Sequence, residues 1–252
     1  MAALREIPAG YASPDQRTIL ADLSRSTLIK ESFFLVGGTA LSVFYLGHRI
    51  SDDIDLFTTE PLSLPAVADI VLRPWAGDVV PLERESSFVS VMLRDVKLDL
   101  AVDRLHDREV RPTADFDPGG RLAVDTLESL AACKLATLIG RVEPKDFVDY
   151  YFIRKEFPAL SAESVFQWAK ARDAAFDDPP MAAAHLREGL RIVLRSAPSG
   201  AGAPAVTGAS GSGSGDDLRR GGLIPFPRLI KPVDWGEFER IFVELTDWLS
   251  AR

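Results

Sequence analysis

A pair of glycines and a pair of aspartates early in the chain are the residues whose types and spacing could do chemistry. Gly37 and Gly38 follow the apolar run Phe33–Val36, which is the pattern of a buried strand entering a tight turn. Glycines let backbone N–H groups approach an anion closely, and a helix N-terminus at such a turn is a ready phosphate site. We predict that Thr39 caps the helix that follows.

The two aspartates, Asp53 and Asp55, belong to a second predicted strand and point to the same face, because side chains alternate along a strand. Neighbouring carboxylates repel each other unless a cation sits between them. Mg²⁺ suits such oxygen ligands, and proteins usually hold it with one or two carboxylates plus substrate phosphates. A phosphate-binding turn together with metal carboxylates predicts an enzyme that uses a nucleotide.

The elements around these residues follow from hydrophobic periodicity. Residues 14–30 are predicted to be helical, and residues 66–72 form another helix-like segment. Phe88–Leu93 and Val96–Val102 predict a hairpin, with Arg94 and Asp95 at its turn. Asp99 lies on the polar face of the second hairpin strand and is a third candidate carboxylate.

From about residue 124 the period becomes helical, and an Asp-x-x-Glu pattern at Asp125 resembles a capping box. Lys134 falls within the apolar stripe of this helix, so it must either reach solvent or meet an anion. Pro144 suits the first turn of the next helix, which carries Asp146 and Asp149. The helix dipole alone would also favour an acid at Asp146.

Further helices are predicted at 162–174, 181–195 and 234–249. Residues 197–222 are rich in Gly, Ser and Ala, and such a composition predicts a flexible coil. The regular Gly-Ser alternation fits either a natural insertion or an engineered linker.

The whole composition is that of an ordinary globular protein, with 252 residues and 46% hydrophobic side chains. The formal net charge of −8 argues against a broad nucleic-acid footprint but allows a local basic patch. Cys133 is the single cysteine, which excludes an internal disulfide and favours the cytoplasm. The N-terminus lacks a secretory signal pattern, and no apolar run approaches the roughly 20 residues of a membrane span, so we expect no membrane association.

Most of the residues discussed so far belong to short motifs that follow one another along the chain at family-like spacing. These motifs are Gly37–Leu41, Arg49 with Ser51, Asp53–Phe57, Lys97–Asp99, Lys134–Ala136, Pro144–Asp149 and Ile230–Trp235. Together they resemble the AbiEii/AbiGii toxin family of nucleotidyltransferases, a branch of the polymerase-β-like superfamily. The resemblance covers most of residues 30–155 and the end of the chain. Thr39 stands where the broader superfamily has serine, and residues 197–222 have no counterpart in the family.

The resemblance implies an α/β (α+β) fold, with a mixed sheet in a nucleotidyltransferase core and a helical C-terminal region. The expected organisation is a core at 1–105, a helical region at 106–196, a linker or insertion at 197–222, and a C-terminal helix within 223–252 that packs back on the helical region.

The resemblance also implies a reaction: Mg²⁺-dependent transfer of a nucleotidyl group from an NTP to a hydroxyl of tRNA or protein, with pyrophosphate leaving. A toxin of this kind would have a cognate antitoxin. The roles carried over are phosphate binding by Gly37, Gly38 and Thr39; metal binding by Asp53, Asp55 and Asp99; catalysis by these three acids with Lys134 and Asp146; and nucleotide binding by Arg49, Ser51, Lys134 and Asp149.

Two other functions stay open at this point. The acceptor could be a small molecule of the aminoglycoside kind, or the protein could bind nucleotides for interaction without turnover. Arg49 also has a purely structural alternative, in which it holds Asp52 or Asp55.

Overall fold

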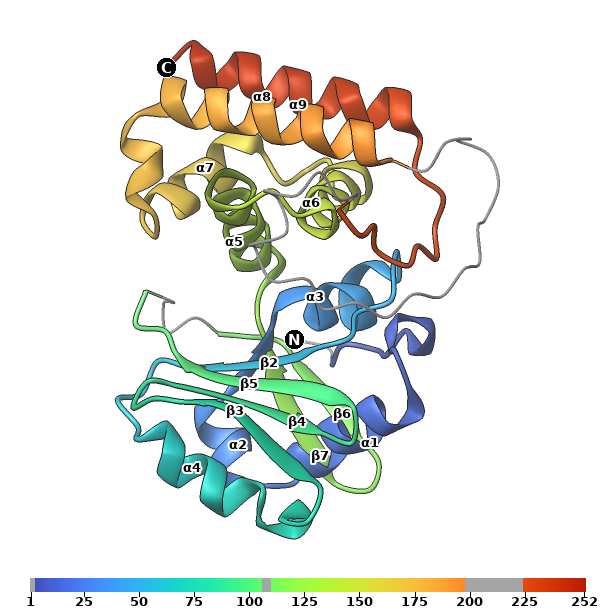
Figure 1. The fold of residues 1–252 in the computed structure, drawn as a ribbon, viewed down its shortest axis with the longest axis vertical. Helices are drawn as coiled ribbons and strands as arrows, with labels where there is room; N and C mark the ends of the chain where they lie inside the picture. The colour runs from blue at the N-terminus through green and yellow to red at the C-terminus, as the bar shows by residue number, and fades with distance from the viewer. Residues whose placement is uncertain (1–2, 106–109, 198–223) are drawn as a thin grey trace. The chain divides into compact units, whose positions relative to one another are not determined.

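The computed structural model describes residues 3–105, 110–197 and 224–252 (Figure 1). The chain divides into two compact units, Met1–Leu130 and Ala131–Arg252, and the division falls within helix α5 (Leu127–Gly140). The N-terminal unit therefore continues past residue 105, where the sequence placed the end of the core.

A mixed sheet forms the centre of the N-terminal unit, with the strand order β3-β4-β5-β2-β1-β7-β6 among the described residues. Strands β2 and β5 pair in parallel, as do β1 and β7, and the other neighbours are antiparallel. This sheet with its helices confirms the predicted α/β fold with a mixed sheet. The strands are β1 (Phe34–Val36), β2 (Ile54–Thr58), β3 (Val79–Arg84), β4 (Phe88–Leu93), β5 (Val96–Val102), β6 (Thr113–Phe116) and β7 (Gly120–Val124).

The hairpin of β4 and β5 has the bounds that the sequence predicted. Arg94 and Asp95 both have positive φ, 49° and 63°, which is the backbone of a type I′ turn between two right-twisted strands. Strands β3, β6 and β7 were not expected from the sequence. Because β6 and β7 extend the sheet beyond β1, they keep the chain in the N-terminal unit as far as Leu130.

The N-terminal unit also contains the helices α1 (Pro14–Leu23), α2 (Thr27–Ser32) and α4 (Leu64–Val71). The predicted helix at 14–30 is thus two helices. Ser13 caps the first of them, since its Oγ accepts a hydrogen bond of 3.1 Å from the backbone N–H of Gln16.

A short helix leaves the end of β1 without a connecting loop. It begins as α3 (Gly37–Ala40) and continues as the π-helical segment η2 (Leu41–Leu46). The segment closes on Gly47, whose φ is 58° and whose N–H donates to the carbonyl oxygen of Ser42 at 3.0 Å. Short 3₁₀ turns lie at η1 (Pro8–Gly10) and η3 (Arg73–Trp75).

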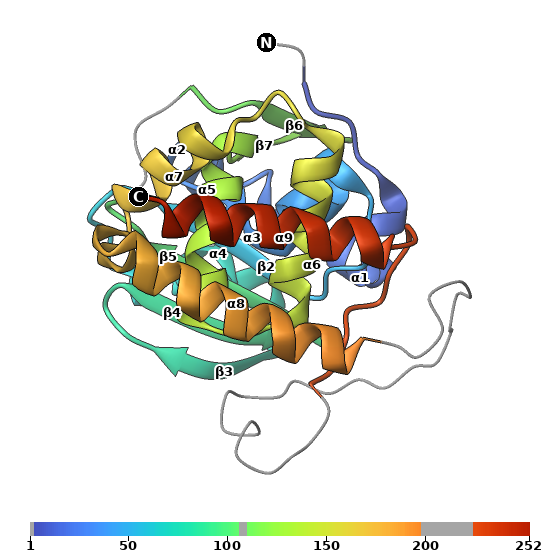
Figure 2. The ribbon, with the colours of Figure 1, turned by 90° about the horizontal axis from the view of Figure 1, so that it is seen from above.

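The C-terminal unit is helical, with α5, α6 (Pro144–Glu156), α7 (Ala162–Lys170), the 3₁₀ turn η4 (Ala174–Asp177), α8 (Pro179–Ser196) and α9 (Trp235–Ser250). Helices α8 and α9 lie side by side, and α9 also contacts α6 (Figures 1 and 2). The rings of Phe147 and Phe242 join α6 to α9 with centroids 5.1 Å apart, and both rings are fully buried.

These helices confirm the helical predictions for this half of the chain. Pro144 starts α6, and Asp234 caps α9 by accepting from the N–H groups of Gly236 and Glu237. The predicted cap of α5 at Asp125 is wrong, because Thr126 Oγ1 accepts from the Ser129 N–H at 3.2 Å.

The Gly/Ser-rich segment predicted at 197–222 lies, apart from its first residue, outside the described residues.

No helix in the described part of the chain is long and apolar enough to cross a bilayer.

Candidate functional site

The two glycines of the predicted phosphate turn are the first two residues of α3. Gly37 has φ of 70°, and a Cβ atom there would lie 2.2 Å from Oδ2 of Asp55. A Cβ atom at Gly38 would lie 2.3 Å from Nη2 of Arg49 and 2.6 Å from Oγ of Ser51. All three distances are far below van der Waals contact, so only glycine lets the helix start pack against these three side chains.

Thr39 is the third residue of α3 and is fully buried. Its Oγ1 donates a hydrogen bond to the backbone carbonyl of Asp53. The residue at the N-cap of α3 is Val36, so the prediction that Thr39 caps the helix is wrong. Thr39 instead ties the helix start to the chain segment that enters β2.

Gln16 on α1 supports the same segment and was missed in the sequence. Its buried side-chain amide donates to the carbonyl oxygens of Ser51 at 2.9 Å and Asp53 at 3.2 Å. Its Oε1 accepts from the N–H of Ala12 at 2.7 Å. A single glutamine in a helix matches no motif, so its role becomes visible only in the folded structure.

The three acids are placed by the sheet. Asp53 immediately precedes β2, and Asp55 on β2 is the register partner of Asp99 on β5. Paired positions on neighbouring strands project from the same face of a sheet, so Asp55 and Asp99 share a face. Asp99 is also the register partner of Ser90 on β4.

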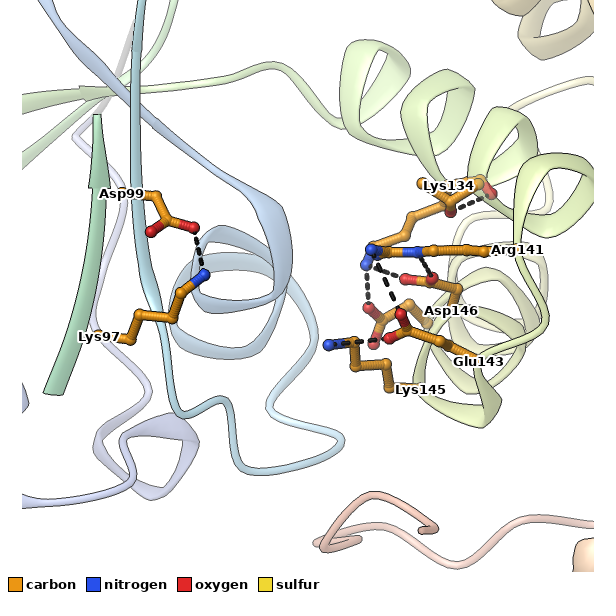
Figure 3. A network of polar contacts seen from close by, with 9 residues as sticks. Lys97, Asp99, Lys134, Arg141, Glu143, Lys145 and Asp146 are labelled. Atoms are coloured by element: carbon orange, nitrogen blue, oxygen red, sulfur yellow. Dashed lines mark hydrogen bonds and ion pairs between the residues drawn. The ribbon is translucent and has the colours of Figure 1, made fainter. Parts of the chain in front are cut away.

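Asp99 is held by two hydrogen bonds and is only 8% exposed. Its Oδ1 accepts from Oγ of Ser90 at 2.6 Å, and its Oδ2 meets Nζ of Lys97 at 2.6 Å (Figure 3). Burial alone lowers the pKa of Lys97, but the hydrogen bond to Asp99 and the charges of the acids nearby raise that pKa above its ordinary value.

The chemistry of this donor set fits a hard divalent cation. Asp53 and Asp55 offer carboxylate oxygens only, and Mg²⁺ is usually completed by water and phosphate oxygens rather than by a protein cage. Within the described residues, no group of three or more His, Cys, Asp or Glu side chains is arranged to hold a metal ion. The candidate ligands are Asp55, which lies against Gly37, and Asp53, which immediately precedes the same strand.

The C-terminal unit contains the second group of predicted residues. Lys134 on α5 is 7% exposed, and its Nζ lies 2.7 Å from both Oδ1 of Asp146 and Oδ2 of Asp149 on α6 (Figure 3). Arg141 adds a contact from its Nε to Oδ2 of Asp146 at 2.9 Å. The sequence predicted that Lys134 either reaches solvent or meets an anion. In the structure Lys134 meets two carboxylates, both of which are fully buried.

Asp146 stays ionised in this cluster despite its burial. Burial by itself raises the pKa of a carboxyl group, but the positive charges of Lys134 and Arg141 outweigh it and hold the pKa of Asp146 below its ordinary value.

The predicted site residues thus fall into two groups. The N-terminal unit brings together the glycine turn and its neighbours, and the C-terminal unit brings together the lysine and its acids. The first group is Gly37, Gly38, Thr39, Arg49, Ser51, Asp53, Asp55 and Asp99, and the second is Lys134, Asp146 and Asp149.

Comparison with solved structures returns several chains of low sequence identity. JHP933 from Helicobacter pylori is 16% identical over 94% of this chain and 89% of its own, with a TM-score of 0.47. MenT4, a nucleotidyltransferase toxin from Mycobacterium tuberculosis, is 16% identical over 94% of this chain and 82% of its own, with a TM-score of 0.48. The antibiotic-resistance factor ANT(2'')-Ia is 17% identical over 69% of this chain and 97% of its own, with a TM-score of 0.45.

No curated protein matches the chain significantly. The family assignment therefore depends on sequence, where the profile described as nucleotidyl transferase AbiEii toxin of type IV toxin–antitoxin systems matches residues 18–196. That span is well over half of the chain and includes both groups of site residues. On this match, the chain belongs to the AbiEii toxin family of nucleotidyltransferases.

Proposed function

We propose that this nucleotidyltransferase is Mg²⁺-dependent, transfers a nucleotidyl group from an NTP to a hydroxyl of tRNA or protein, and acts as the toxin of a toxin–antitoxin pair. The observation that carries the proposal is the packing of the Gly37–Gly38 helix start against Asp55, which shares a face of the sheet with Asp99. This packing supports the proposal, because backbone that would bind an anion then lies beside a carboxylate that would bind a cation.

The start of α3 supplies the phosphate site. The first N–H groups of a helix have no partner within the helix, and the helix dipole adds a partial positive charge there. Residues Gly37–Thr39 present these groups at the start of a helical run that continues to Leu46. Arg49 and Ser51, which lie against Gly38, add a guanidinium and a hydroxyl for the β- and γ-phosphates.

Asp53 and Asp55 would hold the metal, and Asp99 would lie beside the attacking hydroxyl. Bound Mg²⁺ would orient the phosphate oxygens and neutralise the charge that develops on them. Asp99 accepts the proton of the acceptor hydroxyl. The hydroxyl oxygen then forms a bond to the α-phosphorus while the bond to the bridging oxygen breaks, and pyrophosphate leaves in line.

We also propose that Lys134 acts in nucleotide binding as a point charge, and that Asp146 and Asp149 orient its ammonium group. Both acids are fully buried, so we assign them to positioning the lysine rather than to contact with the acceptor.

The biological setting follows from the family. The type IV toxin–antitoxin description supports a cognate antitoxin as partner. Cys133 is the single cysteine, so the chain holds no internal disulfide, which agrees with a reducing cytoplasm as the place of action.

The test is a transfer assay with Mg²⁺ and each α-labelled NTP, in which total tRNA, total protein and a panel of small molecules are offered as acceptors. An Asp53→Ala/Asp55→Ala double variant is run beside an Asp69→Ala/Asp78→Ala control. The control removes two exposed acids of the same unit, which pair with Arg84 and Arg94.

Label on tRNA or protein with the wild type and the control, but not with Asp53→Ala/Asp55→Ala, is the expected result. Label on a small molecule alone would replace the proposed acceptor with an aminoglycoside-like one. Nucleotide binding without transfer to any acceptor would favour the non-catalytic interaction protein.

A further inference from the structure

Lys97 lies among the acids of the candidate metal site. It is two residues before Asp99 on β5, so the two side chains leave the same face of the sheet. Its Nζ is 2.6 Å from Oδ2 of Asp99, and 38% of its side chain is exposed. The ammonium group is therefore at the surface of the acid cluster, where a dissolved cation would also arrive.

The strand register brings Asp53 and Asp55 to this lysine as well. Ile54 pairs with Leu98 and Asp55 with Asp99, so one residue further back Asp53 comes opposite Lys97. The charges of Asp53 and Asp55 both act on Lys97, in addition to that of Asp99. One ammonium group is thus under the charge of three carboxylates, of which Asp99 contacts it directly.

Both carboxylate oxygens of Asp99 accept hydrogen bonds. Oδ1 accepts from Ser90 and Oδ2 accepts from Lys97, each at 2.6 Å. A divalent cation on Oδ2 would lie beside the ammonium, and two cations at such a distance repel strongly. Asp99 is therefore unfavourable for a second ion while Lys97 remains in place.

We propose that Lys97 is a built-in cation of this site, occupying the place beside Asp99 that a second divalent ion would take. The chain then binds one Mg²⁺, at Asp53 and Asp55, and the lysine holds the carboxylate of Asp99 in position. Lys97 is a positioning residue because it acts through Asp99. This inference rests on the proposed function, since it assumes that Asp53 and Asp55 are metal ligands.

The experiment counts bound Mn²⁺ per full-length chain by electron paramagnetic resonance, without nucleotide. The variants are Lys97→Met, Lys97→Arg, Asp99→Asn and Lys97→Met/Asp99→Asn. Lys30→Met is the matched control, because it removes the same charge from an exposed lysine of the same unit that donates to the carbonyl oxygen of Gly119. Thermal melts verify that each variant is folded.

The wild type, Lys97→Arg and Lys30→Met are expected to bind one Mn²⁺ with similar affinity. Lys97→Met is expected to bind a second Mn²⁺, or to bind the first at least about tenfold more tightly, because a positive charge a few ångströms away is gone. Asp99→Asn should cancel that gain in the double variant, since the gain depends on the freed carboxylate.

Two ions per wild-type chain would overturn the inference, and so would a Lys97→Met variant that binds Mn²⁺ as Lys30→Met does. An Asp53→Asn/Asp55→Asn variant separates the two hypotheses. If that variant binds Mn²⁺ as the wild type does, the proposed metal site itself is wrong; if it binds none while Lys97→Met matches the control, the metal site stands and only the role of Lys97 fails.

Discussion

The two glycines at the start of α3 are required for different physical reasons at the same turn. Gly37 needs a positive φ and leaves room for the carboxylate of Asp55, whereas Gly38 leaves room for Arg49 and Ser51. Residue type and spacing alone identified these positions, because a glycine pair after an apolar run and two acids on alternate strand positions are local patterns. Gln16 was not identifiable in this way, since its contacts to Ser51 and Asp53 join distant parts of the sequence.

Gly37→Ala is expected to destabilise the protein more than Gly119→Ala. Gly119 has nearly the same φ, 72°, but no atom would lie within 4 Å of its added Cβ, so its substitution costs about 1 kcal/mol for the backbone alone. At Gly37 the contact with Asp55 adds about 1–3 kcal/mol. Urea unfolding of the two variants measures the difference, and equal losses would show that Asp55 does not fill the space beside Gly37.

At the scale of elements, α5 and α6 are joined by a buried ion cluster. Lys134 makes two contacts of 2.7 Å with acids that have no exposed surface. Removing one partner of such a cluster leaves charge buried without compensation, which is costly in proteins.

Lys134→Met is therefore expected to lower the free energy of unfolding by about 3–5 kcal/mol. Lys145→Met is the matched control, because Lys145 pairs with Glu143 at 3.0 Å but both side chains are well exposed, and such pairs contribute about 0–1 kcal/mol. Urea denaturation compares them. A loss at Lys134 as small as that at Lys145 would mean that the buried acids are satisfied without the lysine.

The same cluster predicts a sensitivity to acid. The pKa of Asp146 is lower in the folded protein than its ordinary value of about 3.9, so the unfolded chain takes up its proton first as pH falls. The stabilisation is complete above that ordinary value and is lost as pH falls below about 4 toward the lower, folded pKa. Asp146→Asn should flatten the acid limb of the unfolding free energy plotted against pH. Parallel curves for the variant and the wild type would contradict this assignment.

Not every element could be predicted from its own residues. The β4–β5 hairpin could, because its second strand alternates apolar and polar residues and a polar pair marks the turn. Strand β3 could not, because almost all of its residues are exposed and its register shifts between Pro81 and Glu83, so it shows no alternation of buried and exposed positions. Strands β6 and β7 are short. They form because β7 pairs with β1 and β6 pairs with β7, and such pairing between distant segments leaves no local sequence pattern.

At the scale of the whole molecule, the proposed function links stability to ligands. A ligand that binds only the folded state stabilises it by about 2.7 kcal/mol at a hundred times its Kd. For a chain of this size each kcal/mol shifts Tm by about 2–4 °C, so saturating Mg²⁺ and nucleotide should raise Tm by about 5–10 °C.

Scanning calorimetry with Mg²⁺ and a non-hydrolysable nucleotide measures this shift. Asp53→Asn/Asp55→Asn should lose most of it, whereas the nucleotide without Mg²⁺ should give a smaller shift with the wild type. An undiminished shift in the double variant would place the ligand elsewhere on the protein.

The π-helical segment η2 restricts how the length of this chain can change over evolution. Its closing bond spans five residues, from the Gly47 N–H to the Ser42 carbonyl oxygen, and so holds one residue more than an α-helical turn. Each residue added or removed there would turn the end of the helix by about 100° and carry Arg49 and Ser51 away from Gly38. Insertions and deletions in related genes should therefore be absent between Gly38 and Arg49, even where the surrounding sequence has diverged beyond alignment.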